Sequence, residues 1–106
     1  MRYQLHNHEV HVSKALEKAI DRKVEKIRKR LKRYHPDVAD LEIKIGHQEK
    51  LNEFECYLIL KAFKETLFTR KCASELRVAV DKSFEAMFKE LDHYRIKLNK
   101  SLQASS

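Results

Sequence analysis

The sequence is poor in glycine and proline, has no tryptophan and lacks any long apolar run. Its 106 residues include one Gly, one Pro and two Cys. P-loops and dinucleotide-binding motifs need several glycines close together, so both are excluded. No apolar stretch approaches the ~20 residues of a membrane-spanning helix, and the N-terminus lacks the apolar core of a signal peptide. We therefore expect a cytoplasmic protein with reduced cysteines.

Charge, in contrast, is abundant and unevenly placed. Charged residues make up 37% of the chain, and the formal net charge is +7. Residues 14–35 hold ten Lys or Arg against three acids, so this segment alone has a charge of +7. Localised basicity predicts a polyanionic partner, with nucleic acid favoured over a membrane surface. The alternative is a solvated helix face that only keeps the protein soluble.

The length fits a single domain, and the hydrophobic periodicity predicts the order β-α-β-β-β-α. We expect an α+β sandwich, a four-stranded sheet with two long helices packed on one face. Residues 1–100 would form the domain and residues 101–106 a frayed tail. The expected strands are 2–5, 41–45, 54–61 and 65–71, with a turn at 46–52, a helix at 14–34 and a second helix from 76 onward.

Both predicted helices carry an apolar stripe at helical spacing. Ser13 is a good N-cap for the first helix, and Pro36 disfavours helix at His35. The stripe of the first helix is Leu16, Ile20, Val24, Ile27 and Leu31. The stripe of the second is Leu76, Val80, Phe84, Met87, Leu91, Leu98 and Leu102.

The polar faces of these helices segregate their charges. A helix that is charged only for solubility usually mixes its signs in i,i+4 pairs. In the first helix, Glu17, Asp21 and Glu25 instead share one flank, and an acid-free arc contains Lys18, Arg22, Lys23, Lys26, Lys29, Arg30 and Arg33. The second helix has a similar arc of Lys82, Lys89, His93, Lys97 and Lys100. Two such stripes suit contacts with phosphates.

Other candidate sites are weaker. His6, His8 and His11 precede the first helix, but no carboxylate or Cys pattern completes a metal-ligand set, so we expect no metal or other cofactor. Hairpin counting around residue 64 places Cys56 and Cys72 roughly opposite each other. That position allows a cross-strand disulfide, while the cytosol favours two neighbouring thiols. Nothing resembles a nucleophile with a base and an orienting acid.

Three segments of the sequence resemble motifs of one known family. The first is Leu5–Leu16, LHNHEVHVSKAL, which is similar to that family's opening. Lys23–Ile27, KVEKI, resembles the family's Lys-Leu-x-Lys-Leu, and Glu75–Asp81, ELRVAVD, resembles its Asp-Met-Tyr-x-Ala-Ile-Asp. The family that these segments resemble is the ribosome hibernation promoting factors, also called ribosome-associated inhibitor A, protein Y or sigma-54 modulation protein. The resemblance covers nearly the whole chain, in order.

The resemblance implies a fold similar to the double-stranded-RNA-binding domain with an extra strand. It implies binding in the decoding channel of the small ribosomal subunit, to 16S-type rRNA and nearby proteins, during stress. Lys23 and Lys26 carry over from the first helix by position, and Lys89 and Arg95 from the second. The chain resembles a short form without a second domain, expected to be a monomer away from the ribosome.

The sequence therefore predicts a non-enzymatic, ribosome-binding translation inhibitor without a membrane partner. The RNA-binding residues would be those of the two basic arcs except Lys100, together with Arg95. A DNA-binding regulatory or architectural domain that uses the same stripes is the alternative. A third hypothesis is a small α+β enzyme whose active site the sequence does not reveal.

Overall fold

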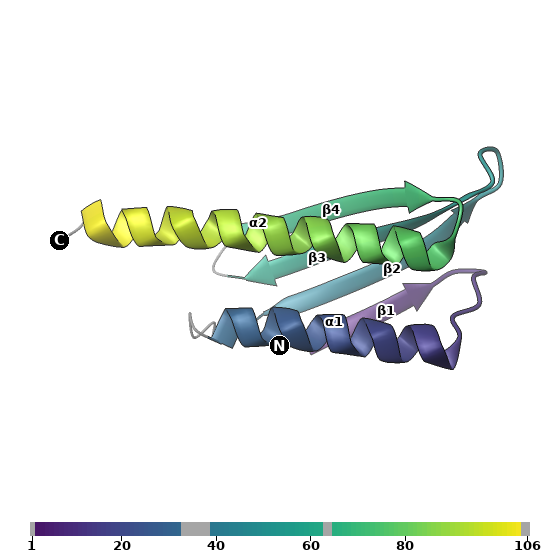
Figure 1. Cartoon of the computed structure of the whole chain (residues 1–106), viewed down its shortest axis with the longest axis horizontal. Coiled ribbons are helices and arrows are strands. Elements are labelled where there is room, and N and C mark those ends of the chain that lie inside the picture. The colour runs from purple at the N-terminus through teal and green to yellow at the C-terminus, as the bar shows by residue number, and fades with distance from the viewer. Residues whose placement is uncertain (1, 33–38, 63–64, 105–106) are drawn as a thin grey trace.

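The computed structural model confirms the α+β architecture (Figure 1). It describes residues 2–32, 39–62 and 65–104, with side chains only as far as residue 94. Two helices lie against one face of a four-stranded sheet and start at the same end of it (Figure 1). The elements are β1 (Arg2–Asn7), α1 (Lys14–Lys32), β2 (Asp40–Gln48), β3 (Glu53–Ala62), β4 (Glu65–Ala73) and α2 (Leu76–Ala104).

The strands lie in the order β1-β2-β3-β4, so β1 and β4 form the edges. β1 and β2 are parallel, with Leu5 opposite Ile43. A parallel pair needs a long crossover connection, which α1 provides. β2–β3 and β3–β4 are antiparallel hairpins. In this topology α1 lies beside β1 and α2 lies beside β4. The hydrophobic core lies between the two helices and the sheet.

The core is built from the predicted stripes. All five apolar residues of the α1 stripe are buried, as are Val80, Phe84, Met87 and Leu91 of α2. Alternate residues of β2 and β3 face them, with Leu41, Ile43, Leu58 and Leu60 almost fully buried. The Ser13 hydroxyl accepts a hydrogen bond from the Leu16 backbone N–H at 3.1 Å, which confirms the predicted N-cap.

Buried polar groups tie α2 to the sheet. Ser83 is fully buried, and its hydroxyl donates to the Cys56 carbonyl at 2.8 Å. The Thr69 hydroxyl donates to the Ser83 carbonyl at 3.1 Å. A buried hydroxyl without a hydrogen-bond partner costs free energy. These bonds therefore favour a single position of α2 across β3 and β4.

The turn predicted at 46–52 is wrong in its first half. Gly46 pairs with Glu55 in the β2–β3 ladder, and β2 continues to Gln48. The reversal is confined to the following four residues, where the Asn52 N–H donates to the Glu49 carbonyl at 3.3 Å and Asn52 has a φ of 48°. Backbone pairing does not require apolar side chains, so the polar end of this strand resembled a turn.

The C-terminal ends of the two helices compare differently with the predictions. α1 is described to Lys32, and the predicted end near Tyr34 lies outside the described residues. α2 runs to Ala104 and projects past the sheet (Figure 1). Its buried apolar residues run from Ala79 to Leu91. The fraying expected for residues 101–106 stays a prediction.

The two cysteines are not neighbours, which corrects the expected arrangement. Both are free thiols. Cys56 pairs with Lys71, and Cys72 pairs with Glu55, because the hairpin register places Ala62 opposite Glu65. That register is one residue away from the predicted one, and a shift of one residue moves a side chain to the other face of a sheet. A cross-strand disulfide between them is therefore excluded.

We predict that the two thiols react very differently. Burial raises the pKa of the Cys56 thiol to about 12, and the residue is fully buried. In the native protein at pH 8, Cys72 should react quickly with a disulfide reagent and Cys56 only after denaturation. Because the pKa of folded Cys56 is raised, its contribution to stability is complete below about pH 8.5 and is lost as pH rises towards 12.

A Cys72→Ser variant is the matched control for this prediction. It should show no fast-reacting thiol and one slow thiol. Two fast thiols in the folded wild type would contradict the buried position of Cys56.

Candidate nucleic-acid interface

The two helices present a row of exposed cations on the side that faces away from the sheet. We call this surface the outer helix face. Counting from the buried stripes at about 100° per residue places these residues opposite the core. All are exposed, and within the described part of the chain none of them pairs with an acid. The surface consists of Lys18, Arg22, Lys26 and Lys29 of α1 and Lys82, Lys89 and His93 of α2.

Lys23 and Arg30, also predicted to bind RNA, point between the helices. The Lys23 ammonium lies 3.1 Å from Asp81 of α2. The Arg30 guanidinium lies 2.8 Å from Asp92, and its carbon is 4.7 Å from the centroid of the Phe88 ring. Both residues therefore hold α1 beside α2. A role of either one in RNA binding stays a prediction.

The remaining predicted residues cannot be placed as side chains. Arg33 lies outside the described residues. Arg95 and Lys97 belong to the helical backbone of α2, but their side chains lie outside the described part. The predicted site is thus seven exposed cationic or titratable groups, two cross-helix ion pairs and three residues without a described side chain.

The acids of α1 lie away from the outer helix face. The Tyr3 hydroxyl of β1 donates a hydrogen bond to Asp21, and this bond, followed by burial, raises the pKa of Tyr3. Glu25 forms an ion pair with Arg28 on the same flank. On α2, Asp81 and Asp92 are used by the cross-helix pairs, whereas Glu85 and Glu90 are exposed. The positive potential is therefore strongest over α1.

The described residues include no cluster suited to a metal ion. No three His, Cys, Asp or Glu side chains among them could hold a metal ion. His6, His8 and His11 are exposed, and His8 lies 3.8 Å from Glu9. None of the helices described is both long and apolar enough to cross a membrane. The arrangement provides fixed positive charge on a rigid support, which is suited to binding a polyanion.

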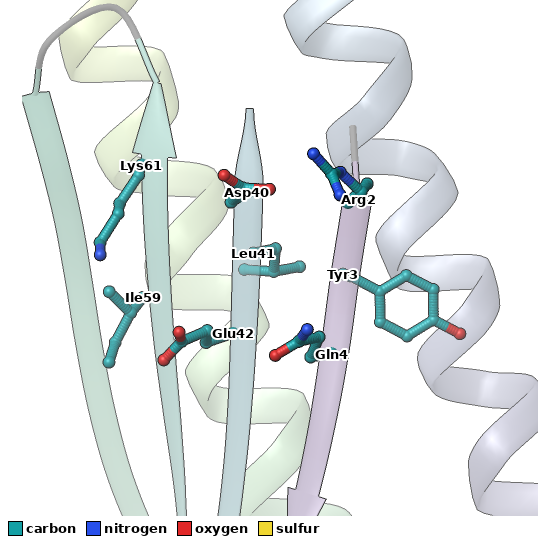
Figure 2. A pocket seen from close by; sticks show the side chains of 8 residues that line it. All are labelled: Arg2, Tyr3, Gln4, Asp40, Leu41, Glu42, Ile59 and Lys61. Atoms are coloured by element: carbon teal, nitrogen blue, oxygen red, sulfur yellow. The ribbon is translucent and has the colours of Figure 1, made fainter. Parts of the chain in front are cut away.

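The sequence reasoning missed the opposite face of the sheet. Figure 2 shows this face near the start of β1, with both helices behind the strands. Arg2, Gln4, Asp40 and Glu42 lie there beside Ile59 and Lys61, and the eight residues labelled line a pocket. The signal was present in the alternation of β3, where the outward positions Glu55, Tyr57 and Lys61 are charged or aromatic.

Comparison with known proteins gives a consistent result. A family model described as sigma 54 modulation protein / S30EA ribosomal protein matches residues 3–99. The N-terminal domain of Thermus thermophilus Protein Y has a similar fold, with a TM-score of 0.69 and 8% identity over 85% of this chain and 93% of that one.

A second solved structure is similar to the same extent. It is a ribosomal subunit interface protein from Coxiella burnetii, with a TM-score of 0.68 and 15% identity over 91% of this chain and 99% of that one. No curated protein matches in sequence. At such identities the two solved structures establish the fold alone.

Proposed function

This chain belongs to the sigma 54 modulation protein / S30EA ribosomal protein family, and on that basis we propose that it is a non-enzymatic hibernation factor that binds the small ribosomal subunit in the cytoplasm. It occupies the decoding channel and thereby inhibits translation. The observation that carries this proposal is the outer helix face, where cations are exposed and the acids of α1 are turned aside.

The geometry of this face suits folded RNA. α1 has 19 residues, which at 1.5 Å per residue is about 28 Å of helix. Lys and Arg along such a length can contact several phosphates and release their counterions. The ion pairs Lys23–Asp81 and Arg30–Asp92 link the two helices. Because both helices pack on the same face of the sheet, both present their cations in one direction (Figure 1).

The proposed mode of action is steric. A domain seated in the decoding channel excludes messenger RNA and transfer RNA without breaking or forming a covalent bond. The Coxiella burnetii relative is described as a ribosomal subunit interface protein, which supports a position between the subunits. Off the ribosome, the chain is proposed to be a monomer.

Salt dependence tests this proposal. The outer helix face has six Lys or Arg residues, and each phosphate contact contributes about 0.7–0.9 to the slope of log K against log salt. We expect a slope of about −4 to −5 for binding to purified small subunits, or a loss of at least about 300-fold between 50 and 200 mM salt. Co-sedimentation through sucrose gradients over a salt series measures it.

Competition with duplex DNA is the control. The protein should bind small subunits in preference to duplex DNA that is present at the same phosphate concentration. The reason is that a shaped binding site adds contacts that a uniform duplex lacks. Equal competition by duplex DNA would favour a DNA-binding domain. A flat salt response would contradict the electrostatic basis of either function.

A further inference from the structure

The face of the sheet that no helix covers has an aromatic centre. Along each strand, alternate side chains point to opposite faces. In the β3–β4 register, Ile59 pairs with Phe68 and Tyr57 pairs with Arg70, so all four side chains lie on the same face. Phe68 is 53% exposed. With Tyr57 and Ile59 beside it, Phe68 forms a contiguous apolar patch, and such patches with a polar rim are typical of interaction sites.

The two rings are held in defined positions. The ring centroids of Tyr57 and Phe68 are 5.8 Å apart and tilted by 47°. The Arg70 guanidinium lies 5.3 Å from the centroid of Tyr57. The exposed surface of Phe68 therefore lies beside the Tyr57 ring, which Arg70 contacts on its face.

Glu55 organises this group. Its Oε2 accepts hydrogen bonds from Arg70 at 3.0 Å, from the Gln48 amide at 3.0 Å and from the Tyr57 hydroxyl at 3.2 Å. The Glu55 side chain is only 15% exposed. Its charge is thus compensated within the surface, and the bonds fix Tyr57 and Arg70 before any ligand arrives.

A hollow lies next to the rings. Gly46 is opposite Glu55 in the β2–β3 ladder, and an added Cβ would lie 3.4 Å from a Glu55 carboxylate oxygen. The Glu55 side chain therefore lies over Gly46, in space that a larger residue would share with it. The hollow is lined by Lys44, Ile45, Gly46, Glu55, Tyr57, Ile59 and Phe68.

The accessible charge around the rings is mostly positive. The side chains of Lys44 and Arg70 are 53% and 44% exposed, and Lys61 is also exposed. Lys44 lies 4.0 Å from Glu42 and Arg70 lies 3.0 Å from Glu55, and these two acids are only 38% and 15% exposed. Lys61 is opposite the half-buried Asp40 in the β2–β3 ladder. Figure 2 shows Lys61 and Ile59 on this face next to Glu42. Exposed cations around exposed rings complement a ligand with both phosphates and flat bases.

We propose that this open face binds unpaired bases of single-stranded RNA, with a base stacked on Phe68 and the RNA backbone contacted by Lys44, Lys61 and Arg70. Bases stack on aromatic rings of sheet surfaces in other single-strand binders, and cations follow the phosphates. The open face lies on the other side of the domain from the outer helix face. This inference therefore goes beyond the proposed function and does not depend on it.

The test is the affinity of the full chain for a labelled single-stranded oligouridylate of about ten nucleotides, measured by fluorescence anisotropy. Phe68→Leu keeps an apolar side chain but removes the π face, and we expect it to weaken binding about tenfold. Phe68→Tyr retains the ring and should bind within about threefold of the wild type. Both variants should bind an RNA duplex of the same length with the affinity of the wild type.

Other outcomes would overturn the inference. If folded Phe68→Leu binds oligouridylate as tightly as the wild type, the ring does not stack on a base. If sedimentation equilibrium shows a wild-type dimer that Phe68→Leu disrupts, with RNA affinity unchanged, the face is a protein contact.

A variant of the outer helix face separates this inference from the proposed function. Lys18→Gln with Lys26→Gln should weaken ribosome and duplex binding but leave the tenfold effect of Phe68→Leu on oligouridylate in place. Loss of that tenfold effect in the helix variant would show that the two faces are one site and would overturn the inference.

Discussion

Removing four outward cations of α1 is expected to weaken binding to the small ribosomal subunit by about 1,000-fold, if each exposed contact contributes about 1 kcal/mol. The substitutions are Lys18→Gln, Arg22→Gln, Lys26→Gln and Lys29→Gln. They lower the formal net charge from +7 to +3. Gln has nearly the helix propensity of Lys and Arg, so the Tm should change little. Filter binding or co-sedimentation with purified subunits gives the affinity, and the slope against log salt should become shallower by about 3.

A variant with the same net charge is the control. It removes four exposed cations that lie elsewhere, namely Lys14, Lys32, Lys50 and Lys71. Lys14 and Lys32 lie on the acidic flank of α1, Lys50 in the β2–β3 turn and Lys71 on the edge strand. If the outer helix face docks at a defined place, this variant should keep most of the affinity. Equal losses in both variants would show that overall basicity, and not the position of the charge, determines binding.

The second large effect concerns stability. Phe84→Ala is expected to lower the free energy of unfolding by about 3–5 kcal/mol. Phe84 is fully buried in the core and lies 6.5 Å from Phe88, ring centroid to ring centroid. Removing its ring leaves a cavity under α2 that neighbouring residues fill only in part. For a domain of this size, the Tm should fall by at least about 12 °C, as measured by urea and thermal unfolding.

Leu51→Ala is the control for the core variant. Leu51 is also a large apolar residue, but it is 65% exposed in the β2–β3 turn. Its loss should change stability by less than about 0.5 kcal/mol. If Phe84→Ala lowers the free energy of unfolding by less than about 1 kcal/mol, the Phe84 ring does not anchor α2 to the sheet. Ribosome binding of Phe84→Ala should fall only with the folded fraction, since the outer helix face is unchanged.

The cross-helix ion pairs are a feature that the charge pattern along a single helix does not reveal. On a helical projection, Lys23 and Arg30 lie in the same arc as Lys26 and Lys29. In the folded domain, α2 brings Asp81 and Asp92 against that edge of the arc. Exposed ion pairs contribute little to stability, but these two orient both helices so that their remaining cations face the same way.

The sequence by itself determined the features that depend on neighbours along the chain. The stripe from Leu16 to Leu31, the Ser13 cap and the alternation in β2 and β3 arise from local periodicity, and all were confirmed. The motifs in Leu5–Leu16, Lys23–Ile27 and Glu75–Asp81, combined with the predicted order of elements, indicated the family that the family model confirms. The segregation of charge on α1 was also visible, because helical geometry alone fixes which residues share a face.

Only the tertiary structure decided what depends on residues far apart in the chain. The register of the β3–β4 hairpin differs by one residue from the predicted register and places Cys56 and Cys72 on opposite faces of the sheet. Pairing with β3 extends β2 into a segment that resembled a turn in the sequence. The partners of Lys23 and Arg30 and the grouping of Tyr57, Phe68 and Arg70 arose in the same way. Hydrophobic patterning specifies which face of an element is buried, but register and cross-element pairs follow from how complete elements pack together.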